Sequence, residues 1–315
     1  MSWNWQRKDW PEFRYDSTGL VELENRFLRE SGTLLGAFKH LNSDERQSIT
    51  IQWISDEALK TSEIEGEILD RESLQSSIRR QLGFQADDKK ASLKEKGIAE
   101  MMVDLYQNFE VPLSHKTLFQ WHWMLLAGSP RIKERGCYRT SADAMQIVSG
   151  PIHDPKVHFE APHSRLVSGE MERFVQWYLN SKSTLPALTR AGIAHSYFVS
   201  VHPFEDGNGR IARAISEKSM AGSIGQPSLV ALAQTIEKKR KDYYEALRSI
   251  NKTNDITTWL HYFAATVLES QKATLDQIEF SIKKAKFYDR FGQRLNDRQA
   301  KVIVRIFKEG PGGFK

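Results

Sequence analysis

The sequence predicts a mainly α-helical protein with one small β element. Apolar residues recur at helical spacing along most of the chain. The exception is the segment 128–165, which is rich in glycine and proline and holds two short β-type runs at 145–148 and 156–159. These runs predict a hairpin or flap. No internal repeat is evident, so we expect a helical bundle with a single small β-hairpin.

The chain begins with an aromatic arm at residues 1–20, in which Pro11 interrupts any helix. We expect this arm to be extended and to pack its aromatic side chains on the body of the protein. A polar, lysine-rich segment at 85–95 predicts an exposed connection. The periodicity predicts helices over residues 19–41, 43–60, 70–82, 96–109, 115–127, 166–181, 188–201, 209–221, 236–250 and 255–284.

Composition excludes several classes of protein. With 315 residues, of which 40% are hydrophobic, the chain is long enough for about two units with ordinary cores. The single cysteine, Cys137, cannot form an internal disulfide, so we expect a cytoplasmic protein. The first residues lack the apolar region of a signal peptide. No apolar run has membrane-spanning length, and no membrane association is expected.

The charge balance gives little indication of a partner. The net charge is +5, but 45 basic residues are scattered among 40 acidic ones. The longest basic cluster, residues 238–241, is typical of a solvated helix face. Nucleic-acid binding is therefore the less favoured interpretation.

The segment 202–213 reads His-Pro-Phe-Glu-Asp-Gly-Asn-Gly-Arg-Ile-Ala-Arg. An apolar helix precedes it, and Pro203 ends that helix. Helical periodicity restarts after Gly209. Gly207 and Gly209 can adopt positive φ and let the backbone approach a ligand, and the N-terminus of the next helix offers free N–H groups to an anion. The pattern predicts an anion-binding loop.

Four side chains in this loop suit phosphate chemistry. Arg210 lies in the first helical turn, where a positive charge is unfavourable unless an anion compensates it. Arg213 follows at i+3 on the same face and adds a second guanidinium. Asp206 is a hard oxygen donor for Mg²⁺ held together with phosphates. His202 can accept a proton near neutral pH.

Simpler interpretations exist for each residue alone. A single histidine at a helix end is more often structural. The run from Gly207 to Ala212 also matches the dinucleotide fingerprint G-x-G-x-x-A, but a helix precedes it and no βαβ unit surrounds it. No Walker A sequence is present. Together within twelve positions, the residues favour a functional site.

The segment resembles the signature of the Fic family, His-x-Phe-x-(Asp/Glu)-Gly-Asn-Gly-Arg-x-x-Arg, at every specified position. The resemblance implies a helical fold that transfers AMP from ATP to a Ser, Thr or Tyr hydroxyl. It implies that His202 is the general base, that Asp206 holds Mg²⁺, and that Arg213 contacts the γ-phosphate. Phe204 is expected to be buried. The anion hole would comprise Gly207, Asn208, Gly209 and Arg210.

The resemblance extends beyond the signature. Residues 145–152 are similar to the family's flap, on which a target segment docks by strand addition. Tyr243 and Tyr244 resemble the family's tyrosines on the adenine side, although amphipathic-helix aromatics are an equally fair interpretation of at least one. The nucleotide-binding residues expected on this basis also include Asn251, Ser149 and Gly150. The expected target-docking residues are Met145, Ile147 and Ile152.

Thr61-Ser-Glu-Ile-Glu65-Gly66 matches the family's inhibitory pattern, (Ser/Thr)-x-x-x-Glu-(Gly/Asn). Thr61 and Glu65 share one helix face, and Gly66 is placed as a helix terminator. The resemblance implies that Glu65 pairs with Arg213 and keeps it from the γ-phosphate. On composition alone, Glu65 would belong to a solvated acidic face together with its acidic neighbours Glu63, Glu67 and Asp70.

These features predict four regions: a Trp-rich N-terminal domain with the inhibitory helix (1–82), a connecting helix (83–112), a Fic catalytic domain (113–266), and a C-terminal helix with the start of an incomplete winged-helix module (267–315). The implied function is an autoinhibited protein adenylyltransferase using Mg-ATP. Transfer of UMP, phosphate or phosphocholine, and a catalytically silent nucleotide-binding protein, stay open. So do the target protein and a homodimeric state.

Overall fold

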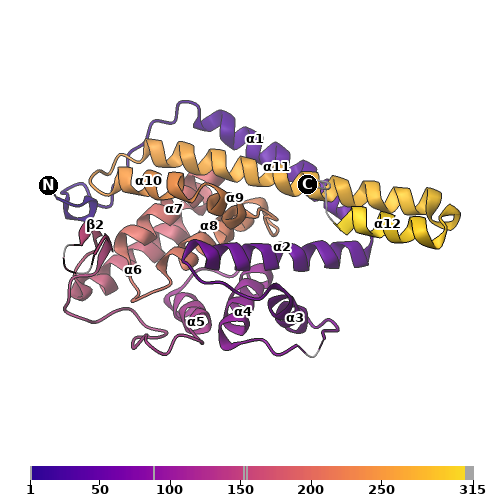
Figure 1. Cartoon of the computed structure of the whole chain (residues 1–315). Coiled ribbons are helices and arrows are strands. Elements are labelled where there is room, and N and C mark those ends of the chain that lie inside the picture. Colours follow the sequence, from indigo (N-terminus) through magenta and orange to yellow (C-terminus); the bar gives the residue numbers. More distant parts are fainter. Residues whose placement is uncertain (1, 88, 152, 154, 309–315) are drawn as a thin grey trace.

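The computed structural model describes residues 2–308 except 88, 152 and 154 (Figure 1). The predicted mainly α-helical fold with a small β flap is confirmed. The helices are α1 Leu20–Lys39, α2 Ser43–Ile64, α3 Arg71–Gln81, α4 Leu93–Gln107, α5 His115–Leu125, α6 Ser164–Asn180, α7 Ala187–Val201, α8 Asn208–Ile224, α9 Leu232–Lys238, α10 Arg240–Ile250, α11 Thr257–Phe291 and α12 Asp297–Lys308. The strands are β1 Gln146–Ser149 and β2 Lys156–Glu160.

Helices α7 and α8 pack against each other at the centre of the molecule. Helix α1 lies along α11, and both pack on α7 (Figure 1). Helix α2 crosses the molecule between α9 on one side and α3 and α4 on the other, and it also touches α8. The helix that carries the predicted inhibitory segment is therefore built into the core beside the helix that follows the signature loop.

Local sequence explains where several helices begin and end. Asn42 accepts a hydrogen bond from the Glu45 backbone N–H, and Glu45 reaches back to Asn42, which forms a capping box at the start of α2. Ser92 and Glu95 do the same for α4. At its far end α2 stops at Gly66, whose φ of +82° is left-handed. Such a terminus requires glycine or a residue that tolerates positive φ.

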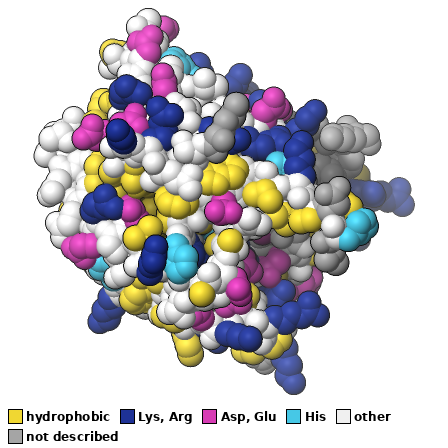
Figure 2. Space-filling view, turned by 90° about the vertical axis from the view of Figure 1, so that its left-hand side faces the viewer, with side chains coloured by type: hydrophobic (Ala, Val, Ile, Leu, Met, Phe, Trp, Pro, Cys, Tyr) yellow, Lys and Arg dark blue, Asp and Glu magenta, His cyan; other side chains and the backbone are white. Residues whose placement is uncertain are grey.

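The flap is an antiparallel hairpin of β1 and β2, with a bulge between Ile147 and Val148. The residues of β1 are all exposed, and Ile147 and Val148 leave 44% and 49% of their surface in solvent. Figure 2 shows the end of the molecule that carries the flap, where hydrophobic side chains are exposed among basic and acidic ones. Ile152, an expected docking residue, lies outside the described residues.

The N-terminal arm packs its aromatic side chains on the body, as the sequence predicts. Trp10 and Phe13 contact Tyr197 of α7 edge-on, with ring centroids 5.2 and 5.4 Å away. Trp3 packs edge-on against Phe159 of the flap at 5.5 Å. Trp5 Nε1 donates to the carbonyl of Glu160 at 2.6 Å. The arm therefore braces the base of the flap against α7.

Several helix limits differ from the sequence-based ones. The helix expected over 236–250 is two helices, because Lys239 leaves the helical region with φ −122° and ψ 37° and redirects the chain between α9 and α10. Helix α2 runs on to Ile64, and α11 runs on to Phe291. Phe307 of α12 packs on aromatic side chains of α11. Residues 309–315, part of the segment that resembles a winged helix, lie outside the described residues.

No helix among the described residues is long and apolar enough to cross a membrane.

Buried Glu24 of α1 ties the N-terminal region to the start of α7. Its carboxylate accepts the backbone N–H groups of Leu188 and Thr189, at 3.0 and 2.7 Å, and the Thr189 hydroxyl at 2.9 Å. These N–H groups belong to the first turn of α7, where a negative charge also favours the helix dipole. The helix that ends at His202 thus starts from a contact made by α1.

We predict that Glu24→Ala lowers the free energy of unfolding by about 3 kcal/mol, because it leaves two buried N–H donors without partners. Glu24→Gln, which keeps one acceptor oxygen, should lose less. The control is Glu22→Ala in the same helix, expected to change stability by less than about 1 kcal/mol. Urea unfolding curves measure all three. Equal effects of Glu24→Ala and Glu22→Ala would contradict this role.

Candidate active site

The loop between α7 and α8 begins at His202, which has φ 49° and ψ 59°. A non-glycine residue in this left-handed region is strained by about 1–3 kcal/mol and persists only where its surroundings hold it. Here Arg139 does so: its Nε donates to the His202 carbonyl at 2.8 Å, and its backbone N–H donates to the Pro203 carbonyl at 2.9 Å. These hydrogen bonds therefore fix the backbone position from which the His202 side chain extends.

The His202 imidazole is held in the neutral state. Burial, and to a smaller extent the charge of Arg139, lowers its pKa to about 4 against the opposing effects of the Val199 carbonyl and of Glu65. Nδ1 lies 3.3 Å from the Val199 carbonyl oxygen, an acceptor, so Nδ1 carries the proton. Nε2 therefore keeps its lone pair and can accept a proton.

Phe204 and Asn208 lock the loop from within. The Asn208 side chain accepts the Phe204 backbone N–H at 3.0 Å and donates to the Phe204 carbonyl at 2.8 Å. The Phe204 ring is fully buried and stacks on His122 of α5, with centroids 4.0 Å apart. Asn208 is expected in the anion hole. In the structure its side-chain amide forms hydrogen bonds within the loop, to the backbone of Phe204.

The two glycines sit where the loop has no room for a side chain. Gly207 has φ +80°, and a Cβ there would lie 2.8 Å from the Leu125 side chain. A Cβ on Gly209 would lie 2.3 Å from the Glu65 carboxylate. Glu65 thus occupies the space directly above the first turn of α8, where the free N–H groups of the helix point.

Arg213 is 1% exposed and is bound by the end of α2. Its Nε donates to the Thr61 hydroxyl at 2.7 Å, and its Nη2 donates to the Thr61 carbonyl at 3.0 Å and to Glu65 Oε1 at 2.8 Å. Nη1 is buried and meets no hydrogen-bond partner among the described groups. The ion pair expected between Glu65 and Arg213 is formed, and one nitrogen of the guanidinium, Nη1, is left without a partner among the described groups.

Arg210 is 2% exposed and also meets carboxylates. Its Nη1 contacts Glu67, and its Nη2 lies 3.5 Å from Asp206 Oδ1. Lys94 of α4 contacts the other oxygen of Glu67 at 3.0 Å. Glu67 was not singled out from the sequence as a site residue, because alternating acids after a helix look like a solvated face.

Asp206 leaves 50% of its side chain in solvent at the mouth of the loop. Among the described residues no cluster of three or more His, Cys, Asp or Glu side chains can hold a metal ion. A single accessible carboxylate is enough for a Mg²⁺ ion whose other ligands are substrate phosphates and water molecules. Asp206 therefore fits the expected role only jointly with a bound phosphate chain.

A buried pair of acids lies behind Arg213. Glu57 of α2 and Glu217 of α8 are each 2% exposed, and Glu57 accepts the backbone N–H of Ala233. Burial raises the pKa of Glu57 to about 7, and burial together with Glu57 raises that of Glu217. No donor reaches the Glu217 oxygens among the described groups, so nothing there compensates a second buried negative charge. The sequence offered no signal for this contact, which only the packing of α2 on α8 creates.

The residues expected on the adenine side lie at three places. Tyr243 is 1% exposed, and its hydroxyl lies 2.9 Å from Nε2 of buried His195. Tyr244 is only partly buried and packs against Tyr243. Asn251 donates its amide to the His158 carbonyl of the flap at 3.1 Å. Tyr243 is therefore anchored in the core, whereas Asn251 ties α10 to the flap.

Ser149 and Gly150 lie at the exposed tip of the flap. The Ser149 hydroxyl is 2.6 Å from His158 Nε2 on the facing strand, and Gly150 has φ +94°. Both stay predicted nucleotide contacts. At the other end of the hairpin, the Met145 carbonyl accepts the Ala161 N–H at 2.9 Å, which closes the ladder.

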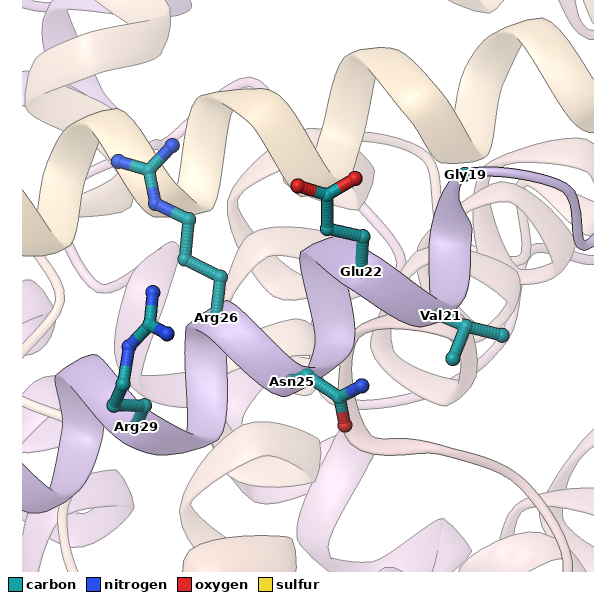
Figure 3. Close-up of a pocket in the computed structure, with 6 residues that line it drawn as sticks. All are labelled: Gly19, Val21, Glu22, Asn25, Arg26 and Arg29. Carbon is teal, nitrogen blue, oxygen red and sulfur yellow. The ribbon is translucent and has the colours of Figure 1, made fainter.

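A surface pocket on α1 is separate from this site. Figure 3 shows Glu22, Arg26 and Arg29 projecting to one side of α1, and Asn25 to the other. None of the residues expected in the signature loop, the inhibitory segment or the flap lines it. This pocket is an open depression beside one charged face of α1, and its lining residues do not indicate a catalytic site.

Comparison with known proteins identifies the family that has this loop. A model of the Fic/DOC family matches residues 112–219, which include the whole loop from His202 to Arg213. The chain carries a Fic domain. A second model, described as a domain of unknown function (DUF4172), matches residues 3–84, which include α1, α2 and Glu65. The wider Fic limits expected from the sequence, 113–266, stay a prediction.

Curated relatives match less than half of the chain. The chain is 34% identical over 131 residues to "Protein adenylyltransferase fic-1" of Caenorhabditis elegans, covering 40% of this chain and 24% of that protein. It is 35% identical over 96 residues to "Protein adenylyltransferase Fic" of Drosophila melanogaster, covering 30% and 18%. The chain spans about a quarter or less of the length of these relatives.

Solved structures share the fold over most of the chain. A Fic family protein from Desulfovibrio desulfuricans superposes with a TM-score of 0.61 at 20% identity, over 80% of this chain and 74% of that one. A Fic-domain protein from Bacteroides thetaiotaomicron gives 0.60 at 19% identity, over 80% and 97%. At this identity the likeness extends to the fold of the Fic domain together with further helices.

The acid pair predicts a pH dependence of stability. The folded protein holds a proton that the unfolded chain releases above the ordinary Glu pKa of 4.5, so stability falls as pH rises from there to about 7. Glu217→Gln removes one ionisable partner. Relative to the variant, the wild type should lose about 2 kcal/mol of unfolding free energy between pH 5 and pH 8.

Urea unfolding at intervals between these pH values measures that difference for Glu217→Gln, with Glu279→Gln on the exposed part of α11 as the control. The control should differ from the wild type by the same amount at every pH. Curves for wild type and Glu217→Gln that stay parallel would show that the pair is not coupled.

Proposed function

We propose that this protein is an autoinhibited protein adenylyltransferase that moves AMP from ATP to a hydroxyl side chain of a protein. The observation that carries the proposal is the complete signature loop, with a neutral His202 whose Nε2 is free and two buried arginines on the first turns of α8. The names of the relatives support the same activity.

His202 supplies the general base. Its Nε2 takes the proton of the target hydroxyl as that oxygen attacks the α-phosphorus of ATP. The new bond joins the target oxygen to the α-phosphorus, and the bond from the α-phosphorus to the bridging oxygen breaks. Pyrophosphate leaves with the electron pair, and AMP stays on the target. Because Nδ1 is held by the Val199 carbonyl, only Nε2 is available for this transfer.

The first turn of α8 supplies the binding site for the phosphates. Its backbone N–H groups and the positive end of its dipole favour an anion, and Gly207 and Gly209 allow the backbone to come close. Arg213, with its spare Nη1, would hold the γ-phosphate. Asp206 would hold Mg²⁺, which neutralises phosphate charge when bound.

Glu65 opposes this arrangement. It occupies Arg213 and the space above Gly209, so a γ-phosphate would have to displace a bonded carboxylate and meet its negative charge. ATP bound elsewhere along the loop would lack the alignment that in-line attack needs. Release of the end of α2 from α8 is therefore part of the proposed reaction cycle.

The flap would bring the target. Its free strand β1 offers exposed backbone groups and exposed apolar side chains, including Ile147, to an extended segment. The base of the flap is fixed by Trp5 and Asn251, so a docked segment would be held at a constant place relative to the loop.

We predict that Glu65→Gly raises transfer and that His202→Ala in that background abolishes it, with a loss of at least about 100-fold in rate because a general base contributes that much. Each variant is incubated with labelled ATP, UTP, GTP or CTP, and mass spectrometry identifies the group added to the protein. His202→Ala should still bind ATP. Undiminished transfer by this double variant, or attachment of a group other than AMP, would refute the proposal.

Glu65 and Arg213 should behave as a coupled pair. Glu65→Gly should stimulate transfer by about ten- to a hundredfold, the equivalent of one charge-assisted hydrogen bond. Arg213→Ala should reduce transfer, since the phosphate loses its guanidinium. Labelling across the two single variants and the double variant measures the coupling. Equal stimulation by Glu65→Gly with and without Arg213 would show that inhibition acts by another route.

A further inference from the structure

Glu67 occupies an unusual place for a charged side chain. The Gly66 N–H donates to the Glu63 carbonyl and the Glu67 N–H donates to the Ser62 carbonyl, which closes α2 in a Schellman turn. The residue in the position of Glu67 ordinarily makes a hydrophobic contact with the last turn. Here its carboxylate reaches away from α2 to α8 and α4 instead. Helix termination therefore does not account for the acid.

The partner of Glu67 is the other arginine of the signature loop. Arg210 is 2% exposed, contacts Glu67 through Nη1, and leaves its buried Nε without a partner among the described groups. Asp206, at 3.5 Å, is the farther of its two acids. A buried guanidinium of this kind needs a close anion, and Glu67 provides it in this structure.

A third charge holds Glu67 from the opposite side. Lys94 stands in the first turn of α4, where a positive charge is unfavourable to the helix dipole, and it contacts the second oxygen of Glu67. Glu67 thus bridges α4 and α8, whereas the ion pair of Glu65 is with Arg213 of α8. The segment after α2 is fastened at two points.

We propose that Glu67 is a second inhibitory carboxylate, which withholds Arg210 from the phosphate chain while Glu65 withholds Arg213. This inference rests on the proposed function, since it assigns both arginines to the triphosphate. Gly66 makes the arrangement possible, because its left-handed conformation turns the chain so that the acids on either side of it both face α8.

The charges of the loop agree with a paired block. With the segment docked, the two acids cancel the two arginines, so the first turns of α8 present little net positive charge to a polyanion. Withdrawal of the segment exposes both guanidinium groups at once. Removing Glu65 alone would free only Arg213 and leave Arg210 neutralised, so inhibition would be relieved only in part.

The test compares ATP affinity and transfer for Glu67→Gln, Glu65→Gly and the double variant, in the full chain. Glu67→Gln keeps the shape of the side chain and removes its charge. We expect it to tighten ATP binding by about tenfold, and the double variant to bind ATP and transfer AMP better than Glu65→Gly by a similar factor. Calorimetry with ATP and labelled-AMP incorporation give the two values.

Glu63→Gln is the matched control. Glu63 belongs to the same acidic run but pairs with Lys60 on the partly exposed face of α2, away from the loop. It should change neither ATP affinity nor transfer. Circular dichroism and melting curves for each variant show that the fold is kept.

The outcomes separate the two proposals. If Glu67→Gln binds ATP with the same affinity as Glu63→Gln, Glu67 has no inhibitory role. If Glu67→Gln binds ATP more weakly, as we expect of Arg210→Ala, the inhibitory role is also overturned and Glu67 is a positioning residue for Arg210. Absence of AMP transfer by Glu65→Gly overturns the proposed function, while the ATP affinities still decide whether Glu67 blocks the site. Folded variants that all fail to bind ATP would overturn both.

Discussion

The burial of Arg213 is the constraint on which the site depends. A guanidinium with 1% exposure must find anions and acceptors inside the protein, and here the end of α2 provides them through Thr61 and Glu65. Thr61 and Glu65 lie four residues apart, so both are on the same side of the end of α2 and both bind the Arg213 side chain of α8. Whatever binds α8 in place of α2 must satisfy the same charge, and a phosphate can do so.

The same dependence explains the acids beneath the site. Glu57 stands one turn before Thr61 on α2, and Glu217 stands one turn after Arg213 on α8. Two carboxyl groups buried together cannot both ionise without repulsion, so they hold a proton near neutral pH. The contact of α2 with α8 therefore combines an ion pair at its open end with a protonated acid pair in its interior.

The N-terminal region is joined to the Fic domain through contacts of several kinds. Glu24 caps α7, the aromatic arm braces the flap, and α2 carries acids to α8. These contacts come from the arm before α1, from α1 itself and from α2. The region matched by the DUF4172 model and the region matched by the Fic model thus pack together, α1 against α7 and α2 against α8.

The sequence by itself determined the helical fold, the hairpin, the loop and the segment 61–66, because these are written in local patterns: periodicity, glycine and proline positions, and a twelve-residue signature. It left Glu67 on a solvated face and gave no sign of Glu57 with Glu217. Only the tertiary structure decided these contacts, since the burial of an acid and the distance to its partner depend on how α2, α4 and α8 pack. Local sequence patterns thus identify the candidate residues, and the packing of the helices determines which charged side chains are in contact.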